Sequence, residues 1–162
     1  MLHVAPYADG EELARLIRDK SKISGKDYVV IDVRDDDYEG GHITGSKHFA
    51  SGSLSSTMPE IINLYSQVPV VYFHCTLSQV RGPKSARMYK EALDLNGVRT
   101  DQTVKVLRGG FSQWQAKYRK EPGLIEDYNP RYWDAEFGMD AQAVEDAKVE
   151  DNEFMKHIPK SA

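Results

Sequence analysis

Three short apolar runs, each followed by a segment with helical spacing, most constrain the fold of this chain. They cover residues 28–33, 70–73 and 103–107 and consist largely of β-branched and aromatic side chains. Nearly continuous apolar runs of this length are typical of strands buried on both faces, as in a parallel sheet. Strands that alternate with helices in this way predict an α/β domain with a mostly parallel sheet flanked by helices.

The segments around these runs show the spacing of helices. Asp9 is a residue type that caps helices, and apolar residues recur behind it at helical intervals. Apolar residues over 54–65 predict a second helix, whose regular part is expected to begin near Pro59 because proline fits the first helical turn. By the same argument a third helix begins near Pro83, and a fourth covers residues 111–120.

The second predicted strand leads into a loop that carries the only cysteine of the chain. Cys75 stands at the end of the strand, and Arg81 follows six positions later, just before a helix start. A helix N-terminus and a guanidinium both favour an anion and lower the pKa of a thiol, so Cys75 is predicted to be a nucleophilic thiolate. Arg81 can bind two oxygens of a tetrahedral oxyanion through its planar fork. The remaining oxygens are expected to bind the backbone amides of five loop residues, Thr76, Leu77, Ser78, Gln79 and Val80.

An unreactive role for Cys75 is the alternative. Cysteine outside disulfides is most often a small buried apolar residue, and a cysteine and an arginine at this spacing also arise by chance. The strand before the loop and the Gly82-Pro83 helix start after it favour the anion site.

Composition and charge restrict the partners of the chain. Its 162 residues suffice for one well-cored domain, and no apolar run approaches the roughly 20 residues that span a membrane. Residues 121–162 hold 11 acidic against 4 basic side chains, whereas the remainder has a small positive excess. A mildly basic body without a basic stripe interleaved with aromatics suits an anionic substrate better than nucleic acid.

The single cysteine also bears on location and metal content. It cannot form an intrachain disulfide, which is typical of a reducing compartment and predicts a cytoplasmic or nuclear protein. It cannot build a cysteine-rich zinc site either, so we expect no structural metal. The N-terminal residues have neither the basic nor the apolar region of a secretory signal.

The loop and two other segments resemble one protein family. Residues 74–84, HCTLSQVRGPK, resemble the active-site loop of the rhodanese-superfamily dual-specificity phosphatases of the M-phase inducer group. They are equally similar to the loop of the small fungal arsenate reductases built on the same fold. Residues 31–43 are similar to the first rhodanese signature and residues 106–111 to the second, so the resemblance covers about residues 9–120.

The resemblance implies a rhodanese-like domain of three layers, with a mostly parallel sheet flanked by helices. We assign residues 1–122 to this catalytic domain and residues 123–162 to an acidic C-terminal extension that packs partly on it. Packing is expected because many aromatic side chains rarely stay exposed together. Four of them fall in this extension: Tyr128, Tyr132, Trp133 and Phe137. A short polar helix is predicted over residues 140–152.

The resemblance also implies roles for individual residues. Cys75 would be the nucleophile and form a phospho-cysteine or arseno-cysteine adduct, and Arg81 would bind the oxyanion and its transition state. The seven-residue loop favours phosphate or arsenate, because sulfurtransferases of this fold have a shorter one. Structural roles, as ion-paired or hydrogen-bonded residues, are expected for Asp32, Arg34, His42, His48 and His74.

Two positions depart from the phosphatase pattern. Val33 stands where M-phase inducer phosphatases have a second cysteine, so an oxidised or arsenylated Cys75 must be rescued by an external thiol. Val80 stands where they have a glutamate, so no loop residue can act as general acid. Other acidic candidates lie in a stretch that we expect to be a solvated loop: Asp35, Asp36, Asp37 and Glu39.

Four functions are compatible with these residues. The favoured one is a cysteine-dependent phosphatase without a bound cofactor, acting on phosphotyrosine or a related monoester. The alternative is an arsenate reductase that uses Cys75 once and takes electrons from glutathione and from glutaredoxin as a partner. Loop length disfavours a sulfurtransferase, and the presence of both Cys75 and Arg81 disfavours a non-catalytic binding module. The expected substrate is therefore a phosphorylated protein or a small oxyanion.

Overall fold

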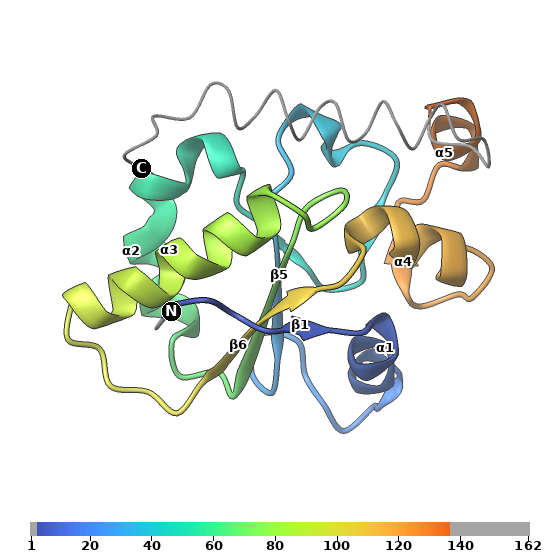
Figure 1. Ribbon diagram of the computed structural model, residues 1–162. Helices are drawn as coiled ribbons and strands as arrows, with labels where there is room; N and C mark the ends of the chain where they lie inside the picture. Colours follow the sequence, from blue (N-terminus) through green and yellow to red (C-terminus); the bar gives the residue numbers. More distant parts are fainter. Residues whose placement is uncertain (1–2, 137–162) are drawn as a thin grey trace.

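A five-stranded sheet forms the centre of the molecule. The computed structural model describes residues 3–136, and the strands of the main sheet follow the order β1-β6-β5-β2-β4 (Figure 1). The bounds in that order are Tyr7–Ala8, Thr103–Leu107, Val70–His74, Val29–Asp32 and Lys47–His48. All four pairings between neighbours are parallel, which confirms the predicted sheet. Two further strands, β3 (His42–Ile43) and β7 (Ile125–Glu126), pair antiparallel.

Helices cover both faces of this sheet and give three layers. α2 (Leu54–Tyr65) and α3 (Arg81–Leu95) lie on one face, and α1 (Gly10–Arg18) and α4 (Gly110–Tyr118) on the other (Figure 1). A fifth helix, α5, covers Pro130–Glu136. Two short 3₁₀ helices precede α2, η1 over Asp36–Tyr38 and η2 over Ser51–Ser53.

The alternation of side chains along each strand explains why the runs are apolar throughout. In β2, Val29 and Ile31 pack into the core beside α2 and α3, whereas Val30 packs into the core beside α1 and α4. In β5, Phe73 and Tyr72 divide in the same way. All four positions of β2 are therefore buried, and each large apolar side chain so buried contributes about 1.5–3 kcal/mol of transfer free energy.

Two predicted helix starts are wrong by a few residues. α2 begins at Leu54 and continues through Pro59, five positions earlier than expected. The proline removes only the N–H that would bond Ser55, and both residues are exposed, so water can satisfy that carbonyl. α3 begins at Arg81, so the arginine that closes the loop is also the first residue of the helix.

Residues 123–136 pack on the body of the domain. Trp133 and Leu124 are buried beside α4, and the Trp133 indole N–H donates to the Gly40 carbonyl oxygen at 2.9 Å. Tyr128 and Tyr132 are partly buried against the same cluster. Phe137 and the helix predicted over residues 140–152 lie outside the described residues, and the boundary at residue 122 stays a prediction.

The described part of the chain contains neither a helix that could span a membrane nor a cluster of metal-binding side chains. Its helices are too short or too polar to cross a bilayer. Across residues 3–136, acidic, histidine and cysteine side chains do not gather in threes in a way that could hold a metal ion.

Candidate active site

The carboxyl ends of the parallel strands meet at one edge of the sheet, where ligands bind in folds of this type. Cys75 directly follows β5, Asp32 ends β2, and Arg108 follows β6. The loop from Cys75 to the start of α3 projects from this edge (Figure 1). The predicted nucleophile and the predicted oxyanion-binding arginine therefore belong to one loop at the expected place in the fold.

The sulfur end of this loop is built from Cys75 and Ser78. The side chain of Cys75 is buried, and the Ser78 N–H donates to its sulfur at 3.2 Å. The Ser78 hydroxyl in turn accepts from the Cys75 N–H at 3.4 Å. Ser78 has a left-handed backbone with φ of 55°, which is strained for a residue other than glycine. This turn directs an N–H at the sulfur, and such a donor favours the thiolate form.

The other predicted oxyanion-binding amides surround the same turn. These are the N–H groups of Thr76, Leu77, Gln79 and Val80. Within the described residues they donate to no protein acceptor, whereas the Ser78 N–H donates to the Cys75 sulfur. A role in oxyanion binding stays a prediction for all five amides.

Gly110, which was expected only as part of the second rhodanese signature, lies against the backbone at the sulfur end. A side chain at Gly110 would lie 2.4 Å from the Cys75 carbonyl oxygen and 2.5 Å from that of Thr76, and its φ is +56°. The next two residues, Phe111 and Ser112, donate their N–H groups to these carbonyls at 3.0 and 2.9 Å. The start of α4 thus holds the backbone of the loop at Cys75 and Thr76. The Gly109-Gly110 pair is the feature of the sequence that could have indicated this close approach.

Tyr7 and Arg108 hold the loop from the side. The Tyr7 hydroxyl donates to the Ser78 carbonyl oxygen at 2.9 Å, and the Arg108 guanidinium carbon lies 5.0 Å from the centroid of the Tyr7 ring. Neither contact was predicted, because Tyr7 is 71 positions away from Ser78 in sequence.

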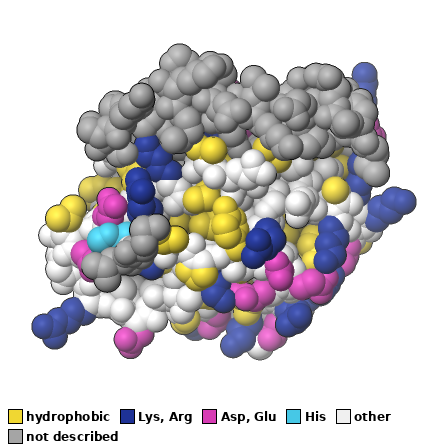
Figure 2. Space-filling view, viewed as in Figure 1, with side chains coloured by type: hydrophobic (Ala, Val, Ile, Leu, Met, Phe, Trp, Pro, Cys, Tyr) yellow, Lys and Arg dark blue, Asp and Glu magenta, His cyan; other side chains and the backbone are white. Residues whose placement is uncertain are grey.

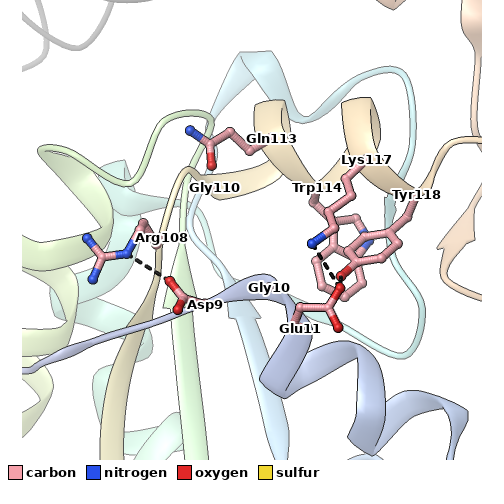
Figure 3. Close-up of a pocket in the computed structure, with 9 residues that line it drawn as sticks. All are labelled: Asp9, Gly10, Glu11, Arg108, Gly110, Gln113, Trp114, Lys117 and Tyr118. Atoms are coloured by element: carbon pink, nitrogen blue, oxygen red, sulfur yellow. Dashed lines mark hydrogen bonds and ion pairs between the residues drawn. The ribbon is translucent and has the colours of Figure 1, made fainter.

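A cavity of about 290 Å³ lies beside Arg108 and Gly110. Its charged side chains are paired: Arg108 contacts Asp9 at 3.0 Å, and Lys117 contacts Glu11 at 2.8 Å (Figure 3). The cavity therefore carries no net excess of either charge. Cationic and anionic side chains also lie side by side in the lower right part of the face shown in Figure 2.

A buried ion pair and a histidine lie behind the sulfur end. Arg34 and Asp32 are inaccessible to solvent and pair at 2.7 Å, which confirms the expected structural pair. Burial alone would raise the pKa of Asp32, but the facing cation Arg34 holds it below its usual range. Burial lowers the pKa of His74, and in its neutral form its Nδ1–H donates to the Cys75 carbonyl at 3.0 Å. His74 thus shapes the loop, as expected.

His42 and His48, the other two histidines with expected structural roles, also make such contacts. The His48 Nε2 contacts the Arg34 carbonyl oxygen at 2.5 Å, and His42 lies 3.3 Å from the Glu126 carboxylate. Both rings stack on Tyr38. These contacts agree with the predicted hydrogen-bonded roles.

The guanidinium end of the loop has a partner that contradicts one expectation. Arg81 donates to the Asp37 carboxylate at 2.8 and 2.5 Å and lies 3.4 Å from Asp35. The predicted solvated loop is therefore wrong for Asp35 and Asp37, although Asp36 and Glu39 are exposed. The physical reason is the turn η1, which directs the residues on either side of Asp36 towards the start of α3.

The environment of Asp37 fixes its charge. Burial would raise the pKa of the Asp37 carboxyl, but the Arg81 hydrogen bonds and charge outweigh it and lower the pKa to about 2. The Thr76 hydroxyl donates to the same carboxylate. Asp37 is therefore ionised at neutral pH and holds no proton in this arrangement.

The fold and this loop define a class of proteins. A profile of the family described as rhodanese-like domain matches residues 11–117. The chain belongs to this family, and the predicted rhodanese-like α/β fold is confirmed.

Characterised relatives carry two kinds of name. The chain is 35% identical to "Dual specificity phosphatase ibp1" of Schizosaccharomyces pombe, over 64% of this chain and 86% of that protein. It is 34% identical to "Arsenate reductase 2.2" of rice, over 70% of this chain and 84% of that protein. The solved structure of Ygr203w, a yeast protein tyrosine phosphatase of the rhodanese family, superimposes with a TM-score of 0.66 at 31% identity, over 82% and 99% of the two chains.

Proposed function

We propose that this protein is a cysteine-dependent phosphatase that hydrolyses phosphotyrosine or related phosphomonoesters, with Cys75 as nucleophile and Arg81 as the oxyanion-binding residue. One observation carries the proposal. The Cys75 sulfur receives the Ser78 N–H at 3.2 Å in the loop that ends in Arg81, the first residue of the 15-residue helix α3. The named phosphatases among the relatives support it.

The geometry suits attack by sulfur on phosphorus. An unperturbed thiol is only about 3% ionised at pH 7, whereas the Ser78 N–H and the start of α3 both stabilise the thiolate. In the first step the sulfur–phosphorus bond forms and the ester oxygen leaves. Water then hydrolyses the phospho-cysteine and restores the thiolate. In this proposal Arg81 binds the equatorial oxygens and stabilises their charge most in the transition state.

The leaving oxygen needs a proton, and the loop offers no acid for it. Val80 cannot donate one, and Asp37 is ionised beside Arg81. We therefore expect the protein to prefer esters with good leaving groups, such as aryl phosphates, and to be slow on alkyl phosphates.

Arsenate reduction is a second candidate, and the relatives named arsenate reductases favour it. Arsenate has the shape and charge of phosphate, so the same residues would bind it. Cys75 is the only cysteine, so the two electrons that convert arsenate to arsenite must come from external thiols. Two glutathione molecules supply them and form glutathione disulfide, with glutaredoxin as the partner that resolves a mixed disulfide on Cys75.

Either activity gives a phosphorylated protein or a small oxyanion as substrate, and requires no bound cofactor. We place both activities in the cytoplasm or nucleus, where a thiol such as Cys75 stays reduced.

Two assays on wild type and Cys75→Ser test these functions. One follows hydrolysis of an aryl phosphate, and the other follows arsenate reduction with glutathione and glutaredoxin. We expect Cys75-dependent hydrolysis. Hydrolysis that persists in Cys75→Ser would exclude Cys75 as nucleophile. Arsenate turnover with negligible hydrolysis would establish the reductase instead. In a third assay, sulfur transfer from thiosulfate to cyanide would exclude both functions.

A further inference from the structure

The contacts of Asp37 link three separate parts of the candidate site. Its Oδ1 accepts from Arg81 Nη1 at 2.8 Å and its Oδ2 from Arg81 Nη2 at 2.5 Å, so the carboxylate meets the guanidinium end-on. The Thr76 hydroxyl donates to the same Oδ2. One side chain from the turn after β2 thus contacts both the residue that follows Cys75 and the first residue of α3.

These contacts are enclosed by protein. The side chains of Arg81 and Asp37 are only 6% and 12% exposed, and the two residues are 44 positions apart in sequence. A bidentate pair of arginine and carboxylate has a defined plane, and burial protects it from exchange with water. The guanidinium is therefore held in one orientation before any ligand arrives.

We propose that Asp37 is a positioning residue, which holds the Arg81 guanidinium and the Thr76 end of the loop in the geometry that binds a tetrahedral oxyanion. This inference rests on the proposed function, and it identifies the residue that holds the oxyanion-binding Arg81 in place. An arginine side chain has several rotatable bonds, and fixing them in advance lowers the entropy cost of binding.

A different role for the same contact makes the opposite prediction. If Asp37 only neutralised Arg81 and competed with the substrate, its removal would strengthen oxyanion binding. Charged groups near Asp37 are Arg81 on α3, together with Arg34 and Asp35 from the turn itself. Asp35 remains in every variant below, so the sign of the change in affinity separates support from competition.

Asp36 provides a matched control. It lies in the same turn η1 and carries the same formal charge, but its side chain is exposed. Asp36→Asn therefore reproduces the loss of one negative charge near the site without the loss of the Arg81 contact.

The experiment measures binding of tungstate, an inert tetrahedral oxyanion, in two ways. One is competitive inhibition of aryl phosphate hydrolysis, and the other is protection of Cys75 from alkylation by iodoacetamide, which needs no turnover. For Asp37→Ala we expect tungstate affinity and kcat/KM to fall by roughly 10- to 100-fold, as for a displaced catalytic group. Asp37→Glu should restore part of both, and Asp36→Asn should change neither by more than about 2-fold.

Thr76→Val is a milder variant that removes the Thr76 hydroxyl, which donates to Asp37 and accepts from Arg81 Nη2 at 3.4 Å. It should shift tungstate affinity in the same direction by a few fold. Thermal unfolding checks that each variant is folded. Tungstate affinity equal to or higher than wild type in Asp37→Ala or Asp37→Asn would overturn the proposal. If wild type lacks both activities, the proposed function fails, yet the alkylation assay still decides whether Asp37 positions Arg81.

Discussion

The two ends of the Cys75–Arg81 loop are held by different kinds of interaction. At the sulfur end, neutral backbone groups dominate: the Ser78 N–H reaches the sulfur, and the start of α4 holds the carbonyls of Cys75 and Thr76. At the guanidinium end, charge dominates, because Arg81 is held by the ionised Asp37. Backbone contacts fix the position of the Cys75 sulfur, whereas an ion pair fixes the Arg81 guanidinium, the proposed oxyanion-binding group.

This difference predicts separable effects. Changes at the sulfur end should alter the stability of the fold and the reactivity of Cys75 together, because Cys75 belongs to the hydrophobic core. Changes at the guanidinium end should alter oxyanion binding with less effect on the thiolate. The predictions below test this separation, beginning with the largest expected effect.

Arg81→Lys should lower kcat/KM for an aryl phosphate by about 10³-fold, because an ammonium cannot replace a planar fork held end-on by Asp37. Steady-state kinetics measure this loss. Alkylation of Cys75 by uncharged iodoacetamide should change by only a few fold, since the Ser78 N–H remains. A comparable loss in both assays would show that the two ends are not separable.

Gly110→Ala should damage the sulfur end. Its Cβ would lie 2.4 Å from the Cys75 carbonyl oxygen, and its φ of +56° already disfavours alanine. We expect a loss of about 3 kcal/mol in the free energy of unfolding, measured in urea, together with slower alkylation of Cys75.

Gly97→Ala is the control for this variant. Gly97 has a similar φ of +62°, but a Cβ there would meet no atom within 4 Å. It should cost only about 1 kcal/mol, the strain of a left-handed alanine. Equal losses at the two glycines would argue against a specific contact between α4 and the loop.

The sequence was informative where the determinants are local. Three apolar runs predicted β2, β5 and β6, because strands covered on both faces are built mostly from apolar side chains. The spacing of Cys75 and Arg81 predicted one loop for both residues, because the end of one strand and the start of the next helix lie close together in the sequence. The resemblance then identified the fold family.

The supports of the loop were beyond such patterns. Asp37 lies in a run of three aspartates. The turn η1 contains both Asp36 and Asp37, and its geometry leaves Asp36 exposed while it directs Asp37 towards Arg81. Its contact with Arg81 spans 44 positions, and that of Tyr7 with Ser78 spans 71. Long-range pairings of this kind depend on strand order, which composition and periodicity do not specify. Gly110 had a local signal, but its role depends on where α4 docks.

Lowering the pH should test the ion pair at the guanidinium end through stability. The Asp37 carboxyl has a pKa of about 2 in the folded protein and 3.8 as the ordinary value. Its contribution of about 2 kcal/mol is therefore complete above pH 4 and disappears as the pH falls towards 2. The difference in the free energy of unfolding between wild type and Asp37→Asn should shrink over this range. A difference that stays constant from pH 5 to pH 2 would contradict the assignment, and Asp36→Asn serves as the exposed control.

Tyr7→Phe should have the smallest effect, and it tests the contact between Tyr7 and Ser78 at the sulfur end of the loop. The change removes the hydrogen bond to the Ser78 carbonyl, yet keeps the ring that lies against Arg108. We expect a loss of about 1 kcal/mol in stability and a few-fold decrease in kcat/KM, because the strained Ser78 turn becomes less fixed. Tyr118→Phe removes a hydroxyl contact to Glu11 at 3.2 Å, remote from the loop. It should cost similar stability without loss of activity, and equal activity in both variants would mean that Tyr7 supports the fold but not the position of the sulfur.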